Sequence, residues 1–398
     1  MTGFLLRLPM LFLFALLAGC GIARLQAPPP EATETLPVLG IPNARFSIDG
    51  SPEPLIREGI VMMQRQMSAL PPGAPRPPTT FLAISGGADN GAFGAGLING
   101  WTAAGNRPSF SVVTGISAGA LIAPFAFLGP DYDQRLSEVF TGVAPRDVLL
   151  LPRQIFAVFP LLFGEALADT SPLARLINRY ANEEMLAAIA REYARGRMLL
   201  VGTTNLDLQR PVVWNIGAIA ASGHPEALTL FRSILLASAS IPGAFPPVLV
   251  PVEYGGRTYQ EMHVDGGAAM QVFLYPPSLN LRERGLNRER FAYVIRNGRM
   301  DVEAGVTARG IFSIARRSAA TLLHFSGVSD ISRIYLTTLR DGVGFRLAFI
   351  GPDFHADRRE PFDPVYMQAL FDYGYAQASR PWHNAPPGVS NVATPARR

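Results

Sequence analysis

Short apolar runs, glycine-rich turns and longer apolar segments follow one another from Thr79 onward. The run Phe81–Ile84 is typical of a short buried strand, and the segment Ala92–Ala104 after it predicts a helix. The same order recurs with a strand over Phe110–Thr114 and a helix over Ala118–Leu128. Strands that alternate with helices favour a parallel sheet covered on both faces. We therefore expect an α/β protein with three layers, α/β/α, around a mainly parallel central sheet.

Later segments continue this pattern without an internal repeat or a dividing linker. Strands are predicted over Met198–Thr203, Pro211–Trp214, Thr258–Val264 and Arg290–Ile295, and helices over Pro172–Tyr180, Leu228–Ala239 and Pro364–Ala378. Residues 79–380 are therefore expected to form one folded domain, and residues 381–398 a loose tail.

The amino terminus has the pattern of a targeting segment. Arg7 precedes an apolar stretch from Leu8 to Leu17 that is too short to span a bilayer comfortably, which predicts a signal peptide over residues 1–20. Leu17-Ala18-Gly19-Cys20 resembles a bacterial lipobox, in which a lipidated Cys20 becomes the mature amino terminus; the alternative is a signal peptide with a chance cysteine. Gly21 after it resembles the signal for the outer membrane. We expect a lipid-anchored protein of the cell envelope that faces the periplasm.

Residues 21–78 are expected to join this anchor to the domain. Two proline-rich stretches, at 28–30 and 71–78, suit a semi-rigid tether. Between them, Pro54–Leu70 carries apolar residues at helical spacing and predicts a helix that docks on the domain.

Composition removes several chemistries. The 398 residues are 48% hydrophobic and 17% charged, which allows a sizeable core. They include no lysine, so a phosphate-loop lysine, a Schiff base and a Ser-Lys dyad are all excluded. The single cysteine, Cys20, excludes an intrachain disulfide and a thiolate metal site. The net charge of +4 is dispersed among acidic residues, as in Arg282–Arg290, so no nucleic-acid partner is expected.

The segment Gly115-Ile116-Ser117-Ala118-Gly119 fits G-x-S-x-G between a predicted strand and helix. Small residues there permit the sharp turn of a nucleophile elbow, which exposes a serine hydroxyl. Ser117 is the candidate nucleophile, flanked by Gly115 and Gly119.

A glycine-rich turn over residues 85–91 precedes a predicted helix and offers backbone N–H donors for an oxyanion hole. The candidate donors are Gly86, Gly87 and Ala88. Gly91, Gly94 and Gly96 have the wrong order for a dinucleotide loop, and a phosphate loop would need lysine at the position of Ala92. Neither reading fits.

Asp265 follows a predicted strand and is itself followed by Gly266 and Gly267. An aspartate in this setting can project into a cleft, so Asp265 is the candidate general base. By itself, Asp-Gly is more commonly only a turn.

These three blocks occur in the order and spacing of patatin-like phospholipases, and the resemblance covers roughly residues 79–378. Further matching segments are Asp169–Leu173, Ala237–Pro247 and Tyr373–Tyr375. The resemblance implies a Ser117–Asp265 catalytic dyad that acts on acyl esters of lipids, of phospholipase A or lysophospholipase type, without a cofactor, metal or histidine. The five histidines, His224, His263, His324, His355 and His383, lie in no recognisable catalytic motif; His263 shares a strand face with Asp265 and is read as structural.

The chain departs from the family pattern in places. Ala88 replaces the usual third glycine of the oxyanion turn, Asn90 replaces the usual arginine, and Gln271 stands where an asparagine is frequent. Asn90 retains a side-chain donor without a positive charge and is kept as an oxyanion candidate. These changes bear on rate and substrate preference.

Two other functions stay open. One is a catalytically silent lipid-binding lipoprotein; the other is an α/β-hydrolase that pairs Ser117 with a histidine after an acid such as Asp330. The apolar stretch Phe156–Phe163 is either an interfacial lid or a buried segment. The lipid headgroup, the acyl position, hydrolysis against acyl transfer, and the oligomeric state do not follow from the sequence.

Overall fold

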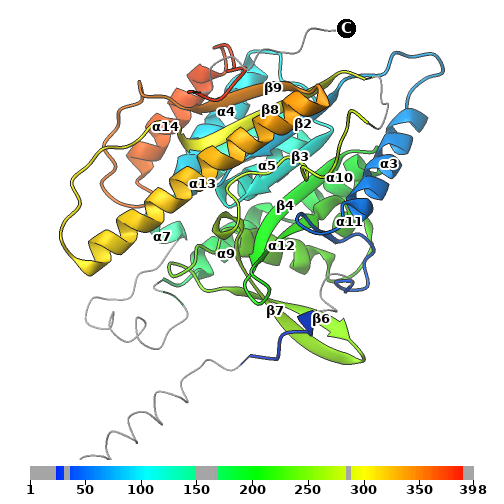
Figure 1. Ribbon diagram of the computed structural model, residues 1–398, viewed down its shortest axis with the longest axis horizontal. Helices are drawn as coiled ribbons and strands as arrows, with labels where there is room; N and C mark the ends of the chain where they lie inside the picture. Colours follow the sequence, from blue (N-terminus) through cyan, green and yellow to red (C-terminus); the bar gives the residue numbers. More distant parts are fainter. Residues whose placement is uncertain (1–23, 31–35, 149–165, 167, 284–287, 389–398) are drawn as a thin grey trace, which may run out of the picture.

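A computed structural model describes residues 24–30, 36–148, 166, 168–283 and 288–388 (Figure 1). A nine-stranded sheet forms its centre, with helices on both faces. The strands are β1 (Arg45–Ser47), β2 (Thr79–Ile84), β3 (Val112–Ile116), β4 (Met198–Asn205), β5 (Arg210–Asn215), β6 (Val248–Tyr254), β7 (Arg257–Asp265), β8 (Arg290–Arg299) and β9 (Gly344–Ile350).

The described helices are α3 (Glu53–Ser68), α4 (Gly91–Ala103), α5 (Ala118–Leu128), α6 (Asp133–Thr141), α7 (Pro145–Val148), α9 (Ser171–Tyr180), α10 (Glu183–Ala194), α11 (Ile216–Ala221), α12 (Ala227–Ser238), α13 (Ile311–Asp341) and α14 (Pro364–Gln377). Short 3₁₀ turns occupy Ala88–Asn90, Pro130–Tyr132 and Gly266–Ala268. No helix in the described ranges is both long enough and apolar enough to cross a bilayer.

The strand order is β1-β5-β4-β3-β2-β8-β9, and the hairpin of β6 and β7 joins the sheet through β4. The five strands from β4 to β9 in this order pair in parallel, whereas β1, β5, β6 and β7 pair in antiparallel fashion. The mainly parallel sheet predicted from the sequence is confirmed. Because β2, β3 and β4 run the same way, the turns after them meet at one edge of the sheet.

Alternate strand residues face two separate cores. Leu82, Ile84 and Val113 belong to the core that includes α4, α5 and α14. Phe81 and Ala83 belong to the opposite core, which contains residues from α13 and contacts from α3. This alternation is the period of a strand buried on both faces, so the three-layer expectation is confirmed.

The segment before β2 differs from the expected tether. The docking helix is present as α3, but residues 36–47 also pack on the domain: Val38 and Ile41 are buried in its core, and β1 pairs with β5. Apolar residues between the two proline-rich stretches make this contact with the domain. The prediction of a tether is therefore wrong for residues 36–47.

The expected loose tail also begins later than predicted. His383 forms a backbone bridge with Leu347, and Trp382 lies against Trp101 and Tyr293 with ring centroids 4.7 and 5.4 Å apart. The aromatic side chain holds the start of the tail on the domain. The predicted signal peptide, Cys20 and the stretch Phe156–Phe163 lie outside the described residues.

Candidate active site

Ser117 lies in the turn between β3 and α5, with the backbone angles φ 55° and ψ −126°. A positive φ is strained for serine and is the conformation expected of a nucleophile elbow. The flanking glycines are required by space. A Cβ on Gly119 would lie 2.3 Å from the carbonyl oxygen of Ile84, and one on Gly115 would lie 2.4 Å from that of Gly119.

Asp265 ends β7 and faces Ser117. The hydroxyl of Ser117 donates a hydrogen bond to Oδ2 of Asp265 at 2.6 Å, and the backbone N–H of Gly267 donates to Oδ1 at 2.7 Å. Both side chains are buried, with 6% of Ser117 and 4% of Asp265 exposed. The structure thus brings the predicted nucleophile and the predicted base together from residues 148 apart in sequence.

Burial dominates the electrostatics of this pair. It raises the pKa of Asp265 to about 7, although the hydrogen bonds from Ser117 and Gly267 favour the ionised form. A carboxylate that titrates near neutral pH can accept and return a proton under ordinary conditions.

Ser238, which sequence reasoning did not single out, holds the elbow. Its hydroxyl oxygen accepts a hydrogen bond from the N–H of Ser117 at 3.0 Å and donates to the carbonyl oxygen of Gly202 at 2.7 Å. The only sequence signal was its place in the matching segment Ala237–Pro247. Ser238 therefore fixes the backbone of the elbow to β4.

The glycine-rich turn lies beside the elbow. A Cβ on Gly86 would come within 3.1 Å of the Cβ of Ser117. The N–H of Gly86 donates to the carbonyl oxygen of Gln271 at 3.0 Å, so it is already engaged. Within the part of the chain that the structure describes, the N–H groups of Gly87 and Ala88 have no acceptor. Gly87 and Ala88 therefore remain as candidate backbone donors of the oxyanion hole. The prediction that Gly86 is such a donor is wrong in this geometry.

Asn90 does not face Ser117 as expected. Its Oδ1 accepts a hydrogen bond from the hydroxyl of Tyr366 at 2.7 Å, and it lines a separate polar cavity with Arg299 and His355. Asn90 is the last residue of the 3₁₀ turn, whereas Ala88, its first residue, lines the cavity beside Ser117. The assignment of Asn90 to the oxyanion hole is wrong in this geometry.

Two amide side chains brace the turn. Asn297, after β8, donates from Nδ2 to the carbonyl oxygen of Ser85 at 2.8 Å and accepts from the N–H of Gly94 at 3.0 Å. Gln271 donates from Nε2 to the carbonyl oxygen of Gly267 at 2.9 Å. Gln271 therefore links the turn at Gly86 to the turn that carries Gly266 and Gly267.

A cavity of about 50 Å³ opens beside Ser117. Its walls are almost entirely apolar. They come from the glycine-rich turn, from α5, α6, α7, α9 and α14, and from the segments after α12 and before α14: Ala88, Ala118, Leu121, Val139, Phe140, Val148, Leu173, Leu176, Ala239, Ile241, Phe245, Phe362 and Met367. An apolar wall beside a nucleophile suits an acyl chain better than a polar substrate.

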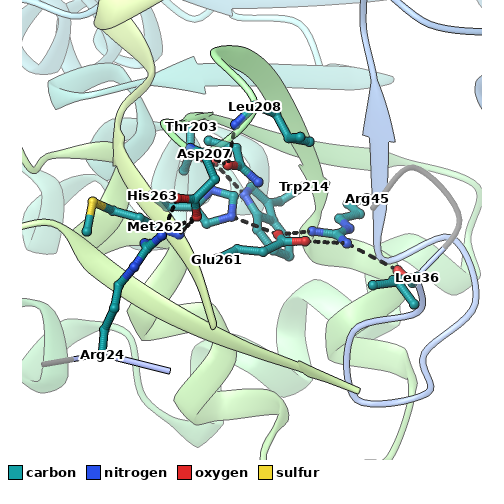
Figure 2. A network of polar contacts seen from close by, with 11 residues as sticks. Arg24, Leu36, Arg45, Thr203, Asp207, Leu208, Trp214, Glu261, Met262 and His263 are labelled. Carbon is teal, nitrogen blue, oxygen red and sulfur yellow. Dashed lines mark hydrogen bonds and ion pairs between the residues drawn. The ribbon is translucent and has the colours of Figure 1, made fainter. Parts of the chain in front are cut away.

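His263 belongs to a buried network beside the strand pair that carries Asp265 (Figure 2). Thr203 Oγ1 accepts from Trp214 Nε1 at 2.8 Å and lies 3.0 Å from His263 Nδ1. The other ring nitrogen of His263 lies 3.1 Å from Glu261, which pairs with Arg45. Burial lowers the pKa of His263, so the ring is neutral at pH 7. All polar atoms of the ring are thus engaged away from Ser117.

The hydrogen bonds of Ser117 and Asp330 argue against a catalytic histidine. Among the described residues, Asp265 is the side chain to which the hydroxyl of Ser117 donates, and no histidine hydrogen-bonds to it. Asp330 accepts the N–H groups of Gln271 and Val272 instead, which argues against a triad with that acid. No group of three or more potential metal ligands occurs in the described residues.

Residues 82–276 match the family model of patatin-like phospholipases. No curated protein matches the chain significantly. VipD from Legionella pneumophila is similar at 13% sequence identity over 76% of this chain and 66% of its own, with a TM-score of 0.36. Human GIVD cytosolic phospholipase A2 is similar at 11% identity over 80% of this chain and 53% of its own, with a TM-score of 0.31. The type III effector protein ExoU is similar at 13% identity over 77% of this chain and 53% of its own, with a TM-score of 0.20. The chain spans between about half and two thirds of the length of these proteins.

Proposed function

This chain belongs to the patatin-like phospholipase family, and from that premise we propose that it hydrolyses acyl esters of lipids with Ser117 as nucleophile and Asp265 as base. The observation that carries the proposal is the 2.6 Å hydrogen bond between these two buried side chains. The apolar cavity beside Ser117 supports a substrate with an acyl chain.

The reaction proceeds in two halves. Asp265 takes the proton of Ser117 while Oγ bonds to the ester carbonyl carbon, and the oxygen of the tetrahedral intermediate accepts hydrogen bonds from Gly87 and Ala88. The intermediate then breaks the bond to the leaving alcohol, which receives the proton from Asp265. Water, deprotonated by Asp265, next attacks the acyl-enzyme, and the fatty acid leaves as Ser117 regains its proton.

The substrate class follows from the expected location. We propose that Cys20 is lipidated and that the domain is held at the cell envelope, at the outer membrane facing the periplasm. A hydrolase in that position meets phospholipids and lysophospholipids, so activity of phospholipase A or lysophospholipase type is the finer assignment.

The test measures acyl release from p-nitrophenyl butyrate and from phosphatidylcholine vesicles. Ser117→Ala and Asp265→Asn should each lower kcat/KM by at least about 10³-fold, because each removes one half of a unit that acts together. Asp372→Asn, which changes an exposed carboxylate on α14, is the matched control and should retain full activity.

Labelling by a fluorophosphonate separates the alternatives. The parent protein should be labelled at Ser117, and Ser117→Ala should not. A parent that neither takes the label nor releases acyl groups would instead support a catalytically silent lipoprotein.

A further inference from the structure

Helix α13 exposes a large apolar surface outside the candidate active site. Its buried residues all lie in the half from 327 to 341, while residues 311–325 extend past the sheet (Figure 1). Eight of the sixteen large apolar side chains that the described residues expose lie between 302 and 325: Val302, Val306, Ile311, Phe312, Ile314, Leu322, Leu323 and Phe325. Leu322 is 73% exposed and Phe312 is 72% exposed. Clustering on this scale marks a contact surface, since scattered single residues would need no explanation.

The exposed half of α13 has two distinct sides. Ile311, Ile314, Leu322 and Phe325 recur at the spacing that aligns side chains along one side of a helix, and Phe312 and Leu323 adjoin this row. The other side carries Ser313, Arg317, Ala320 and His324. A helix of this kind lies in the plane of a lipid–water interface with its apolar side inserted.

The charge of this region has one sign. No aspartate or glutamate occurs between Glu303 and Asp330, whereas Arg309, Arg316 and Arg317 do. In the described ranges no carboxylate pairs with any of these arginines, and the hydrogen bond of Arg317 goes to the backbone oxygen of Glu303. Uncompensated positive charge beside an apolar row matches an anionic lipid surface.

The topology places this half of the helix at the edge where Ser117 lies. β8 pairs in parallel with β2, and β2 pairs in parallel with β3, so the chain leaves β8 at the same edge as the elbow after β3. α13 then returns to the opposite edge to enter β9, which is parallel to β8. Its amino-terminal half therefore lies at the elbow edge, as does α7, whose Val148 lines the cavity beside Ser117.

We propose that residues 311–325 dock on the surface of an anionic lipid bilayer. The helix lies on the surface with Ile311, Leu322 and Phe325 inserted, while Arg316 and Arg317 contact lipid phosphates. The proposal concerns binding, and it holds whether or not the domain hydrolyses esters.

The test places a fluorophore on the helix. The full chain with Cys20→Ser has no cysteine and cannot be lipidated at residue 20, and Ser117→Ala in the same chain leaves the vesicles intact. Leu322→Cys in this background carries an environment-sensitive nitrobenzoxadiazole label on the apolar side. Ala320→Cys, two residues away on the other side of the helix and also exposed, carries the same label as the matched control.

With vesicles of phosphatidylcholine and phosphatidylglycerol, the label at position 322 should shift to the blue and brighten, whereas the label at 320 should change little. Replacing Arg316 and Arg317 by glutamate should weaken binding by about tenfold, and added salt should also weaken binding. Because these side chains are exposed, the melting temperature should not change.

Three outcomes would overturn the proposal. Equal responses at 320 and 322 would mean that α13 does not present its apolar side to lipid. An unchanged spectrum at 322 while the protein sediments with vesicles would assign binding to another segment. A blue shift that depends on protein concentration without vesicles would mean that this side pairs with a second copy of the chain.

Discussion

Asp265 faces two conflicting demands, because a general base must ionise and a buried carboxyl resists ionisation. Burial raises its pKa to about 7, and the hydrogen bonds from Ser117 and Gly267 only partly offset this effect. Only the ionised fraction can accept the proton of Ser117. For p-nitrophenyl butyrate, kcat/KM should therefore fall about tenfold for each pH unit below 7 and level off above it.

Initial rates between pH 5 and pH 8 provide the measurement, and Asp372→Asn should follow the same curve as the parent. A profile that stays flat across this range would remove Asp265 from the role of base. A profile that falls on the alkaline side would point to a group that must be protonated, which the dyad does not contain.

Helices α4 and α14 pack so closely that the backbone at a glycine of each helix contacts the backbone of the other helix. A Cβ on Gly96 would lie 2.0 Å from the carbonyl oxygen of Phe371, and one on Gly374 would lie 2.2 Å from that of Phe93. The sequence offered Gly91, Gly94 and Gly96 only as a failed dinucleotide motif. Gly96 lets α14 approach the helix that follows the oxyanion turn, whereas a Cβ on Gly91 would meet Phe140 and one on Gly94 would meet Asn297.

Gly96→Ala should lower the free energy of unfolding by about 1–3 kcal/mol or more, because backbone atoms cannot move aside as a side-chain end can. Gly59→Ala is the matched control. Gly59 also lies within a helix, α3, but a Cβ there meets nothing within 4 Å, so the change should raise the free energy of unfolding by about 0.5–1 kcal/mol. Urea unfolding measures both. A loss at Gly96 no larger than about 0.5 kcal/mol would show that the helices can separate without cost.

The elements that the sequence predicts best are strand–helix pairs in which a uniformly apolar, buried strand is followed by a short glycine-rich turn. β2 with α4 and β3 with α5 have this form, and their predicted positions agree with the structure within two residues. β1 is three residues long and gains its place by pairing with β5, which no local pattern records. α13 was not predicted, although its exposed half carries apolar residues at helical spacing. The elbow and the aspartate carry local motifs, whereas Ser238 acts only through a long-range contact.

At the scale of the whole molecule, an ion pair with the buried carboxylate of Glu261 joins the amino-terminal segment to the sheet. The side chain of Glu261 is fully buried and pairs with Arg45 of β1, which also donates to the carbonyl oxygen of Leu36 at 3.3 Å. Burial alone would raise the pKa of Glu261, but the hydrogen bonds from His263 and Arg45 and the charge of Arg45 bring it below its ordinary value. Glu261 is therefore ionised at neutral pH and depends on Arg45 for its partner (Figure 2).

Arg45→Gln should accordingly lower the free energy of unfolding by about 3–5 kcal/mol, since it leaves a buried carboxylate without its cation. Arg135→Gln removes the cation of an exposed pair with Glu184 and should cost at most about 1 kcal/mol. The double change Arg45→Gln with Glu261→Gln should recover part of the loss, because the uncompensated charge is then absent. Urea unfolding at pH 7 measures all three. Should Arg45→Gln cost no more than Arg135→Gln, residues 36–47 would be held by apolar packing and by the pairing of β1 with β5, and Arg45 would have no part in joining the segment to β7.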